Sequence, residues 1–585
     1  MAKLSHQIIT SQSIFFTILI LATSTPPEDP IKCSSTNTDC TITNSYGAFP
    51  DRTTCHAAHV AYPRSENDLI SIIANATKSK TKMKAATRYS HSIPKLACPG
   101  GHNGLLISTK HLDRVIEIDR SKMTITVESG VTLRQLIEEA AKSGLALPYT
   151  PYWWGLTIGG LLSTGAHGST LWGKGSAVHE YLTQVRMVSP GRAEEGYVVV
   201  RTLDEGGVGP EMDAARVSLG VLGVISQVTL RLQPMFKRSI SYVKKKDLNL
   251  AEEAVELGRK HEFADITWYP SQKQVIYRID DRVSTNVQGN GLLDHIGFRP
   301  TPSPALLALR LAEETQELSH NNVAKCVQGA LTTTTLETTA YGLTNDGILF
   351  KGYPVIGYHN RLQASGSCLD GLDDKEITVC PWDSRVKGLF YHQTAFSIGL
   401  SNVKSFIEDM QKLMNLVPKS LCGLDQYNGI LMRYVTRSNA YLGKQEDAID
   451  FDITYYRSTD PKIPRLYEDI LEEIEQMAII KYGGLPHWGK NRNVAFDGAI
   501  LKYKNASKFF QVQQNFDPLG LFTNEWNDQI FGKKDSVVIV KEGCALEGLC
   551  VCSEDLHCAP KKGYFCRSGK VFKDARVCTF EVGRN

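Results

Sequence analysis

The fold is decided by the stretch Thr157-Ile158-Gly159-Gly160-Leu161-Leu162-Ser163-Thr164-Gly165-Ala166-His167-Gly168-Ser169, in which four of thirteen residues are glycine. Glycine adopts backbone conformations with positive φ and leaves room for a ligand that a side chain would exclude. Two interpretations follow from this composition. The segment is either a tight structural loop, or a place where bare backbone amides approach a pyrophosphate or a flat cofactor ring.

Two common nucleotide-binding motifs fail on this segment. Gly168-Ser169-Thr170-Leu171-Trp172-Gly173-Lys174 supplies a P-loop except for its last position, where Gly175 replaces the Ser or Thr that binds magnesium. A good strand does not precede it, and the Rossmann pattern G-x-G-x-x-G is absent. The sequence therefore argues against a P-loop ATPase and a Rossmann dinucleotide site.

The composition is that of a folded globular protein. The 585 residues are 42% apolar and 22% charged, with a formal net charge of +3. So small a charge gives no electrostatic case for binding nucleic acid. Collagen, coiled coil, a disordered chain and a multi-pass membrane protein are excluded by the same figures.

The first residues resemble an export signal. Lys3 precedes the apolar run Ile14–Ala22, which is followed by Thr23-Ser24-Thr25. Because this run is shorter than the roughly 20 residues that span a bilayer, we predict a cleaved signal peptide over residues 1–25, with an uncleaved anchor as the alternative. We expect the secretory pathway, with an extracellular, apoplastic or vacuolar destination, and no stable membrane insertion. Asn75 and Asn505 then become glycosylation acceptors.

Cysteine placement supports an oxidising compartment. Six of the 14 cysteines lie in the last 42 residues, which predicts a small module over 540–585 stapled by three disulfides. Fifteen connectivities are possible, and the spacing does not choose among them. The alternative is a zinc knuckle that uses Cys550, Cys552, His557 and Cys558. Upstream, Cys33, Cys40 and Cys55 lie close together in the sequence, and the others are scattered.

Between residues 62 and 235, short strand patterns alternate with helical patterns and glycine turns. Ser65 is placed to cap a helix through Leu69 and Ile73. The patterns predict strands at 82–86, 115–118 and 124–127 and at the end of 216–232, with a loop at 87–92. Beyond 240 they predict helices at 249–260, 305–318, 403–416 and 465–481, and strands at 275–279, 430–436 and 449–456.

The order of these pieces resembles the FAD-binding domain of the p-cresol methylhydroxylase (PCMH) type, found in the vanillyl-alcohol-oxidase family. Pro486-His487-Trp488-Gly489-Lys490 and Phe516-Asp517-Pro518-Leu519-Gly520-Leu521-Phe522 are similar to the aldonolactone-oxidase branch, in particular the plant L-gulonolactone oxidases. The resemblance runs from about residue 50 to 535 and includes the Cys-rich tail. It implies an α+β, two-lobed protein: a PCMH-type FAD domain over 55–235, a mixed α/β substrate (cap) domain over 236–535, and the disulfide-rich module.

The resemblance also implies the cofactor site. In that family the loop Arg88-Tyr89-Ser90-His91-Ser92 would wrap the pyrophosphate, and His91 would bond covalently to the flavin. The alternative for His91 is a hydrogen bond to phosphate or backbone. The segment beside the flavin would comprise Ile158, Gly159, Gly160, Gly165, Ala166, His167 and Gly168, and the residues beside the adenosine would be Gly223, Val224 and Ile225.

Three residues carry the implied catalysis. Lys490 would stand at the flavin N1–C2=O edge and stabilise the negative charge that forms during reduction. His487 would line the same pocket, and Arg433 would hold a substrate oxygen. Relatives often carry Glu-x-Arg on this strand, whereas here Leu431 replaces the acid. The general base is therefore unassigned, with His487 as a candidate; outside a site, Arg433 would be a cross-strand charge partner.

The resemblance implies oxidation of L-gulono-1,4-lactone at C2, giving a 2-keto lactone that tautomerises to L-ascorbate. The electrons would pass to O2, giving H2O2, or to another acceptor. Two alternatives stay open. One is a flavin enzyme acting on another sugar, lactone or polyol, and the other is a secreted glycoprotein of this fold that acts by binding.

Overall fold

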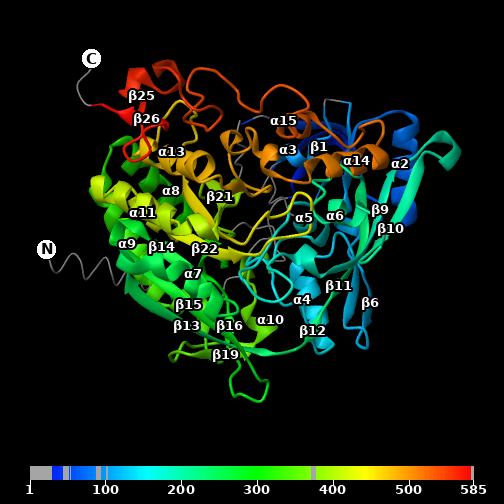
Figure 1. The fold of residues 1–585 in the computed structure, drawn as a ribbon, viewed down its shortest axis with the longest axis horizontal. Coiled ribbons are helices and arrows are strands. Elements are labelled where there is room, and N and C mark those ends of the chain that lie inside the picture. Colours follow the sequence, from blue (N-terminus) through cyan, green and yellow to red (C-terminus); the bar gives the residue numbers. More distant parts are fainter. Residues whose placement is uncertain are drawn as a thin grey trace.

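The computed structural model describes residues 29–43, 52, 54–86, 94–100, 103–207, 209–370 and 377–581. Two lobes stand side by side in Figure 1, one built from the described residues between 29 and 235 and one from the described residues between 236 and 485. The C-terminal segment, residues 506–581, runs across the top of both lobes in this view. The predicted signal peptide and the loop 87–92 lie outside the described residues. The predicted α+β fold class is confirmed.

The first lobe contains two five-stranded sheets, with the strand orders β1-β2-β3-β5-β4 and β10-β9-β11-β7-β6. The β3–β5 and β4–β5 pairs are parallel and the other pairs are antiparallel. The strands are β1 (Ile31–Ser35), β2 (Thr38–Ile42), β3 (Cys55–Ala61), β4 (Met83–Ala86), β5 (Leu105–Ser108), β6 (Val115–Asp119), β7 (Thr124–Glu128), β9 (Leu182–Pro190), β10 (Val198–Asp204) and β11 (Val224–Arg231). The helices are α2 (Glu66–Lys78), α3 (Pro94–Ala97), α4 (Leu133–Lys142), α5 (Ile158–Ser163) and α6 (Glu211–Ala215).

Helix α2 forms where its capping pattern predicts. The Ser65 hydroxyl accepts a hydrogen bond from the backbone N–H of Asp68 at 3.1 Å, which satisfies a donor that the first turn leaves unpaired. Leu69 and Ile73 are buried on the face that covers the sheet. The exposed Asn75 lies on the opposite side of the helix.

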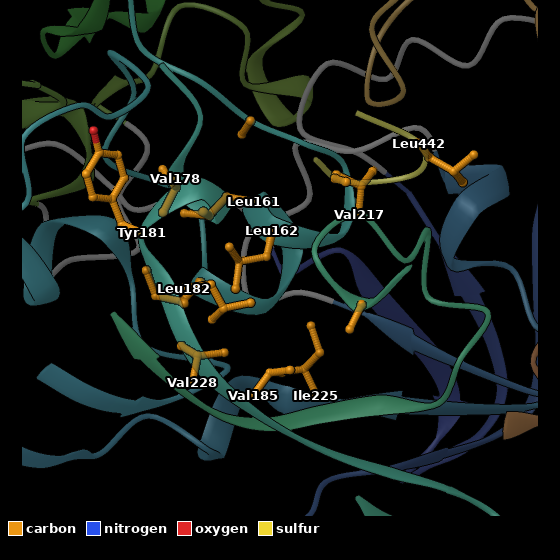
Figure 2. Packing of buried hydrophobic residues seen from close by; sticks show 14 of the residues in the cluster. Leu161, Leu162, Val178, Tyr181, Leu182, Val185, Val217, Ile225, Val228 and Leu442 are labelled. Atoms are coloured by element: carbon orange, nitrogen blue, oxygen red, sulfur yellow. The ribbon is translucent and has the colours of Figure 1, made fainter. Parts of the chain in front are cut away.

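The glycine-rich segment differs from the expected loop, because its first half is the short helix α5. Leu161 and Leu162 point from this helix into a core formed with Val185, Ile225 and Val228 of β9 and β11 (Figure 2). Burial of these two leucines explains why the chain coils here despite its glycines. The helix ends at Ser163, and the chain turns away at Gly165, whose φ of +68° is a conformation that glycine adopts without strain.

The second lobe is built on an eight-stranded antiparallel sheet, in the order β19-β13-β15-β14-β22-β23-β21-β24. Its strands are β13 (Lys237–Lys246), β14 (Asp265–Tyr269), β15 (Gln274–Val283), β19 (Val355–Tyr358), β21 (Tyr391–Gly399), β22 (Ile430–Val435), β23 (Ala448–Tyr456) and β24 (Leu485–Pro486). Its helices are α7 (Leu250–Lys260), α8 (Ser303–Leu318), α9 (Asn322–Thr338), α10 (His359–Leu362), α11 (Leu400–Leu416), α12 (Cys422–Gln426) and α13 (Glu468–Gln476), the last continuing as a π-helical turn (Met477–Lys481). The four helices and three strands predicted beyond residue 240 are confirmed, with ends shifted by a few residues.

Three two-stranded pairs complete the body of the chain, namely β8 (Leu145–Ala146) with β12 (Gln233–Pro234), β16 (Leu292–Leu293) with β18 (Leu343–Thr344), and β17 (Thr301–Pro302) with β20 (Thr378–Val379). After β24 the chain returns to the first lobe through α14 (Ala506–Phe516) and α15 (Glu525–Ile530). Phe509, Phe516 and Trp526 join the core that contains α5. No helix among the described residues is long and apolar enough to cross a membrane.

The tail is a compact module around the hairpin of β25 (Tyr564–Ser568) and β26 (Arg576–Phe580). Its cysteines form the disulfides Cys544–Cys550, Cys552–Cys566 and Cys558–Cys578, which confirms three bridges. The zinc alternative is wrong, because no thiolate remains there to bind a metal. The other pairs are Cys33–Cys40, Cys55–Cys98, Cys326–Cys422 and Cys368–Cys380.

Candidate active site

The large sheet has one apolar and one polar face. Met432 and Tyr434 of β22 and Phe451 of β23 pack against α7, α11 and α13. Because side chains alternate across a strand, the neighbouring positions point to the other face. Arg433 and Asp450 are therefore directed away from the helices, although both are almost completely buried.

Four charged side chains meet on this polar face. The Asp452 carboxylate pairs with the Lys490 ammonium, and the same Oδ2 lies 3.2 Å from an Arg433 guanidinium nitrogen. That Arg433 nitrogen is also 3.4 Å from Asp450 Oδ2. Lys490 keeps 16% of its side chain exposed and Asp452 keeps 9%, whereas Asp450 is fully buried. The cluster thus has a buried end and an accessible end.

Asp450 forms the buried end and stays negatively charged. Burial alone would raise its pKa, but Lys444, His167 and Arg433 hold the pKa well below the usual range of a carboxylic acid. The Ser397 hydroxyl donates to its Oδ1 at 2.8 Å. This carboxylate is therefore a fixed anion that holds the surrounding cations in place.

Two imidazoles face each other beside the cluster. His167 comes from the glycine-rich segment and His487 from the loop after β24. Their ring centroids are 5.6 Å apart. Burial and the charge of Arg433 lower the pKa of His167 to about 4, and burial together with Lys490 lowers that of His487 well below its ordinary value. Both rings are consequently neutral at physiological pH.

The loop that carries His487 and Lys490 is fastened to β21 by Asn491. The Asn491 amide accepts from the backbone N–H of Ala395 at 2.7 Å and donates to the carbonyls of Ala395 and His487 at 3.1 and 3.2 Å. Asn491 adopts φ of +77°, which turns the chain back onto the strand. Sequence patterns contain no signal for this role.

Hydrogen bonds join the polar face to the glycine-rich segment. Arg433 donates to the carbonyl of His167 at 3.2 Å. The backbone N–H of Thr170 donates to the carbonyl of Tyr434 at 3.0 Å, and the N–H of Tyr434 donates to the Ser169 hydroxyl at 3.0 Å. The structure therefore brings Arg433, His487 and Lys490 together with His167.

The other expected cofactor residues divide into three groups. Arg88, Tyr89, Ser90, His91 and Ser92 lie outside the described residues. The second group lies in or directly after α5 and comprises Ile158, Gly159, Gly160, Gly165, Ala166 and Gly168. The third group begins β11, where Gly223 has φ of +120° and passes close to the Val188 carbonyl, while Val224 and Ile225 are buried in the core.

Unpaired polar groups around α5 fit a cofactor with hydrogen-bonding and anionic parts. The Ser129 and Thr157 hydroxyls are buried and have no hydrogen-bond partner among the described residues, and Thr157 stands at the start of the helix. Lys84 is fully buried, and among the described residues its ammonium donates to the carbonyls of Leu219 and Gly220, at 3.4 Å each. Burial lowers the pKa of Lys84 to about 7. A phosphate-bearing ligand such as FAD would satisfy groups of this kind.

Comparison with known proteins supports this assignment. The chain is 63% identical to "Probable L-gulonolactone oxidase 6" of Arabidopsis thaliana over 563 residues, which cover 96% of this chain and 93% of the relative. It is 63% identical to "L-gulonolactone oxidase 5" of the same plant, with 96% of each chain covered. The chain belongs to the plant L-gulonolactone oxidase family. The mouse L-gulonolactone oxidase is 23% identical over 80% of this chain and 94% of the mouse chain.

Three family descriptions match successive parts of this chain. An FAD binding domain matches residues 57–192, D-arabinono-1,4-lactone oxidase matches 384–530, and the C-terminal domain of L-gulonolactone oxidase 2-like proteins matches 541–580. This member of the plant family is therefore an FAD-dependent oxidoreductase. The second match includes Arg433, His487 and Lys490, and the first includes the glycine-rich segment.

Solved structures show the same fold. A solvent-stable cholesterol oxidase superposes with a TM-score of 0.63 at 15% identity, covering 87% of this chain and all of that chain. A variant of the Physcomitrella patens BBE-like 1 protein superposes with a TM-score of 0.51 at 10% identity, covering 80% and 91%. At these identities the similarity establishes the α+β flavoprotein fold alone.

The sequence analysis missed four residues of the cluster: Asp450, Asp452, Lys444 and Asn491. Asp450 and Asp452 gave one signal that could have been used, because two acids stand at alternate positions in an otherwise apolar strand. Leu431 stands where relatives carry an acid, and β23 places two carboxylates, Asp450 and Asp452, beside Arg433 from across the ladder.

Proposed function

We propose that this protein oxidises L-gulono-1,4-lactone at C2 to a 2-keto lactone that tautomerises to L-ascorbate. One observation carries the proposal. The Lys490–Asp452–Arg433 cluster of the large sheet lies against the glycine-rich segment of the FAD-binding lobe, through the contact of His487 with His167. A polar lactone held at this junction would present its C2 hydrogen to the cofactor.

Residues of the site have separate roles in the proposed reaction. Bound FAD supplies the acceptor for the two electrons of the C2–H bond. The Lys490 ammonium provides positive charge that stabilises the negative charge developing on the cofactor. His487 lines the pocket, and Arg433 anchors both carboxylates and the carbonyl of His167, so its guanidinium orients the site and meets a substrate oxygen.

Three further proposals concern the cellular compartment of the protein, the covalent attachment of FAD and the domain boundaries. Seven disulfides that engage all 14 cysteines support folding in an oxidising compartment, hence secretion through the predicted signal peptide and glycosylation at Asn75 and Asn505. Covalent attachment of FAD through His91 is tested by acid precipitation, because a covalent flavin stays with the precipitated protein. We retain the division into an FAD domain over 55–235, a substrate domain over 236–535 and a module over 540–585.

A second candidate is the oxidation of another sugar, lactone or polyol. Leu431, which is partly exposed, places an apolar side chain beside Asp452 on the site face. A substrate with fewer polar groups at this position would fit equally well. A panel of lactones against polyols separates the two candidates.

The visible spectrum of the purified protein tests the function. Under anaerobic conditions, addition of L-gulono-1,4-lactone is expected to bleach the flavin band. Readmission of air restores the band if O2 is the acceptor, with H2O2 as the product to be measured. If this lactone leaves a yellow protein unbleached and another donor bleaches it, that other donor is the substrate. A colourless protein would refute flavin chemistry.

A further inference from the structure

Alcohol oxidation requires a group that accepts the hydroxyl proton while the hydride leaves carbon. This inference rests on the proposed function and concerns which residue that group is. Four side chains around the cluster of the large sheet have the right chemistry: His487, His167, Asp450 and Asp452. Their hydrogen bonds and burial distinguish them.

His487 is oriented to donate a proton rather than accept one. The backbone N–H of Gly489 donates to its Nδ1 at 3.0 Å, so Nδ1 carries the lone pair and the neutral ring bears its hydrogen on Nε2. A ring in this tautomer presents an N–H to a substrate or cofactor oxygen. It would accept a second proton only as an imidazolium, a form that burial and Lys490 disfavour.

His167 and Asp450 are shielded from a substrate. His167 Nδ1 lies 2.9 Å from the carbonyl of Gly168 and its Nε2 lies 3.4 Å from Asp450, with 1% of the side chain exposed. The Asp450 carboxylate is fully buried and is occupied by Ser397, Arg433 and Lys444. Neither residue has an accessible atom that could take a proton from a bound sugar.

Asp452 is the remaining candidate, and it differs from Asp450 in its exposure and in its direct contact with Lys490. About 9% of its side chain is exposed, against none for Asp450, and its carboxylate contacts the Lys490 ammonium that the proposed function places beside the reacting centre. Gln393 donates to its Oδ1 at 3.2 Å and Arg433 to its Oδ2 at 3.2 Å, which fix the orientation of the group. In the ladder it stands between Ala395 of β21 and Leu431 of β22.

We infer that Asp452 is the proton acceptor of the reaction. The hydroxyl proton passes to the Asp452 carboxylate as C2–OH becomes C2=O, and bound FAD would accept the C2 hydrogen together with its electron pair. Two electrons thus leave the lactone and the proton leaves later to solvent. Lys490 and Arg433 stabilise the carboxylate before the transfer, and His487 donates a hydrogen bond.

The test measures the anaerobic rate of flavin reduction by L-gulono-1,4-lactone as a function of pH. Asp452→Asn is expected to slow reduction by at least ~100-fold and to abolish the acidic limb of the profile, since a general base contributes roughly 10²–10⁴-fold. The dissociation constant of the 2-deoxy lactone, measured through its perturbation of the flavin spectrum, is expected to stay within about threefold of the wild-type value, because that ligand has no C2 hydroxyl proton to transfer. The control is Asp574→Asn, an exposed acid of the tail that should change none of these.

Two further variants separate a catalytic from a structural role. Asp452→Glu keeps a carboxylate and should retain the acidic limb while reduction slows by about 10-fold or more, as expected for a misplaced catalytic group. Because Leu431 is the register partner of Asp452, Leu431→Glu in the Asp452→Asn background returns a carboxylate to the same place and should restore a large part of the rate.

The inference is overturned if Asp452→Asn reduces its flavin within tenfold of the wild-type rate and keeps the acidic limb. If that variant does not retain flavin, Asp452→Glu decides, and a rate and profile identical to wild type would reject the inference. Failure of the proposed function is distinguishable, because then the wild-type protein itself is not reduced by the lactone.

Discussion

At the scale of single residues, the site depends on charges that the fold has removed from water. Lys490, Asp452 and Arg433 form a partly buried network in which each charge has an opposite partner. Such a network is strong in a region of low dielectric constant and costly to leave incomplete. Single substitutions here should therefore have large and specific effects.

Replacement of Lys490 tests its assigned role. Lys490→Met removes the ammonium while keeping the length of the side chain, and we expect kcat to fall by about 10²–10³-fold, the usual loss when one stabilising charge or donor is removed. Flavin content should be unchanged. Steady-state kinetics with the flavin absorbance as the measure of occupancy check this, with Lys561→Met in the exposed tail as the control. Unchanged turnover would remove Lys490 from the mechanism.

Lys84 predicts a pH-dependent stability in the flavin-free protein. Its pKa in the fold is about 7, below the 10.5 of an exposed lysine, so the unfolded chain binds the proton more tightly. Stability should therefore rise with pH between these values, by up to about 1.4 kcal/mol per pH unit. Urea unfolding of Lys84→Met at pH 7, 8 and 9 should lack the rise. An equal rise in the variant and in the wild type would show that another group causes it.

At the scale of elements, α13 shows how one helix serves two neighbours. Ile470, Leu471 and Ile474 pack against the large sheet. The other face carries acids at helical spacing, and these hold the Cys-rich module: Glu472 accepts from the backbone N–H of Cys578 at 2.6 Å, and Gln476 exchanges two hydrogen bonds with Arg576. The acidic face of α13, whose composition is typical of a solvent-exposed surface, is therefore the interface with the Cys-rich module.

Glu473 is the central contact of that interface. Its carboxylate accepts from the backbone N–H groups of Lys570, Val571 and Phe572 at 2.7, 2.6 and 2.7 Å. Glu473→Gln replaces one acceptor oxygen by a donor, and we expect a loss of at least about 2–3 kcal/mol, since hydrogen bonds to charged groups contribute about 1.5–3 kcal/mol each. Urea unfolding and proteolysis of the tail measure it. Glu542→Gln, on an exposed acid, should have no effect; an equal loss there would refute the interpretation.

At the scale of the whole molecule, cross-links and returning segments connect parts far apart in the sequence. Residues after β24 pack into the first lobe, where the Leu521 carbonyl accepts from the N–H of Met83 at 2.8 Å. Cys326–Cys422 joins α9 to α12 across 96 residues, whereas Cys544–Cys550 spans 6. The longer loop restricts the unfolded chain more.

The disulfides should therefore differ in their contribution to stability. We expect Cys326→Ser with Cys422→Ser to cost about 4.7 kcal/mol and Cys544→Ser with Cys550→Ser about 2 kcal/mol, from the loop lengths. Denaturant unfolding of the two double variants gives the comparison. A larger loss for the short loop would show that packing in the module, rather than chain entropy, dominates.

Much of the fold could be predicted from local patterns. The cap at Ser65, the apolar spacing of α11 and the alternation in β23 are short-range features, because a helix or strand buries one face at a fixed period. The helical form of α5 could not, since its glycines favour a loop and only the core around Leu161 and Leu162 decides otherwise.

The sequence by itself determined the fold class, the family resemblance and the segments that form the candidate site, because these depend on residue type and order. Tertiary structure alone decided which acids stand beside Arg433. Asp450 and Asp452 are 17 and 19 residues away along the chain and reach the site through the register of β22 with β23, in which Asp450 is opposite Arg433 and Asp452 is opposite Leu431. Register is a cross-strand property, set by the packing of the apolar face, and it has no local signature. The seven disulfide pairings were decided in the same way, by which cysteines the folded chain brings together.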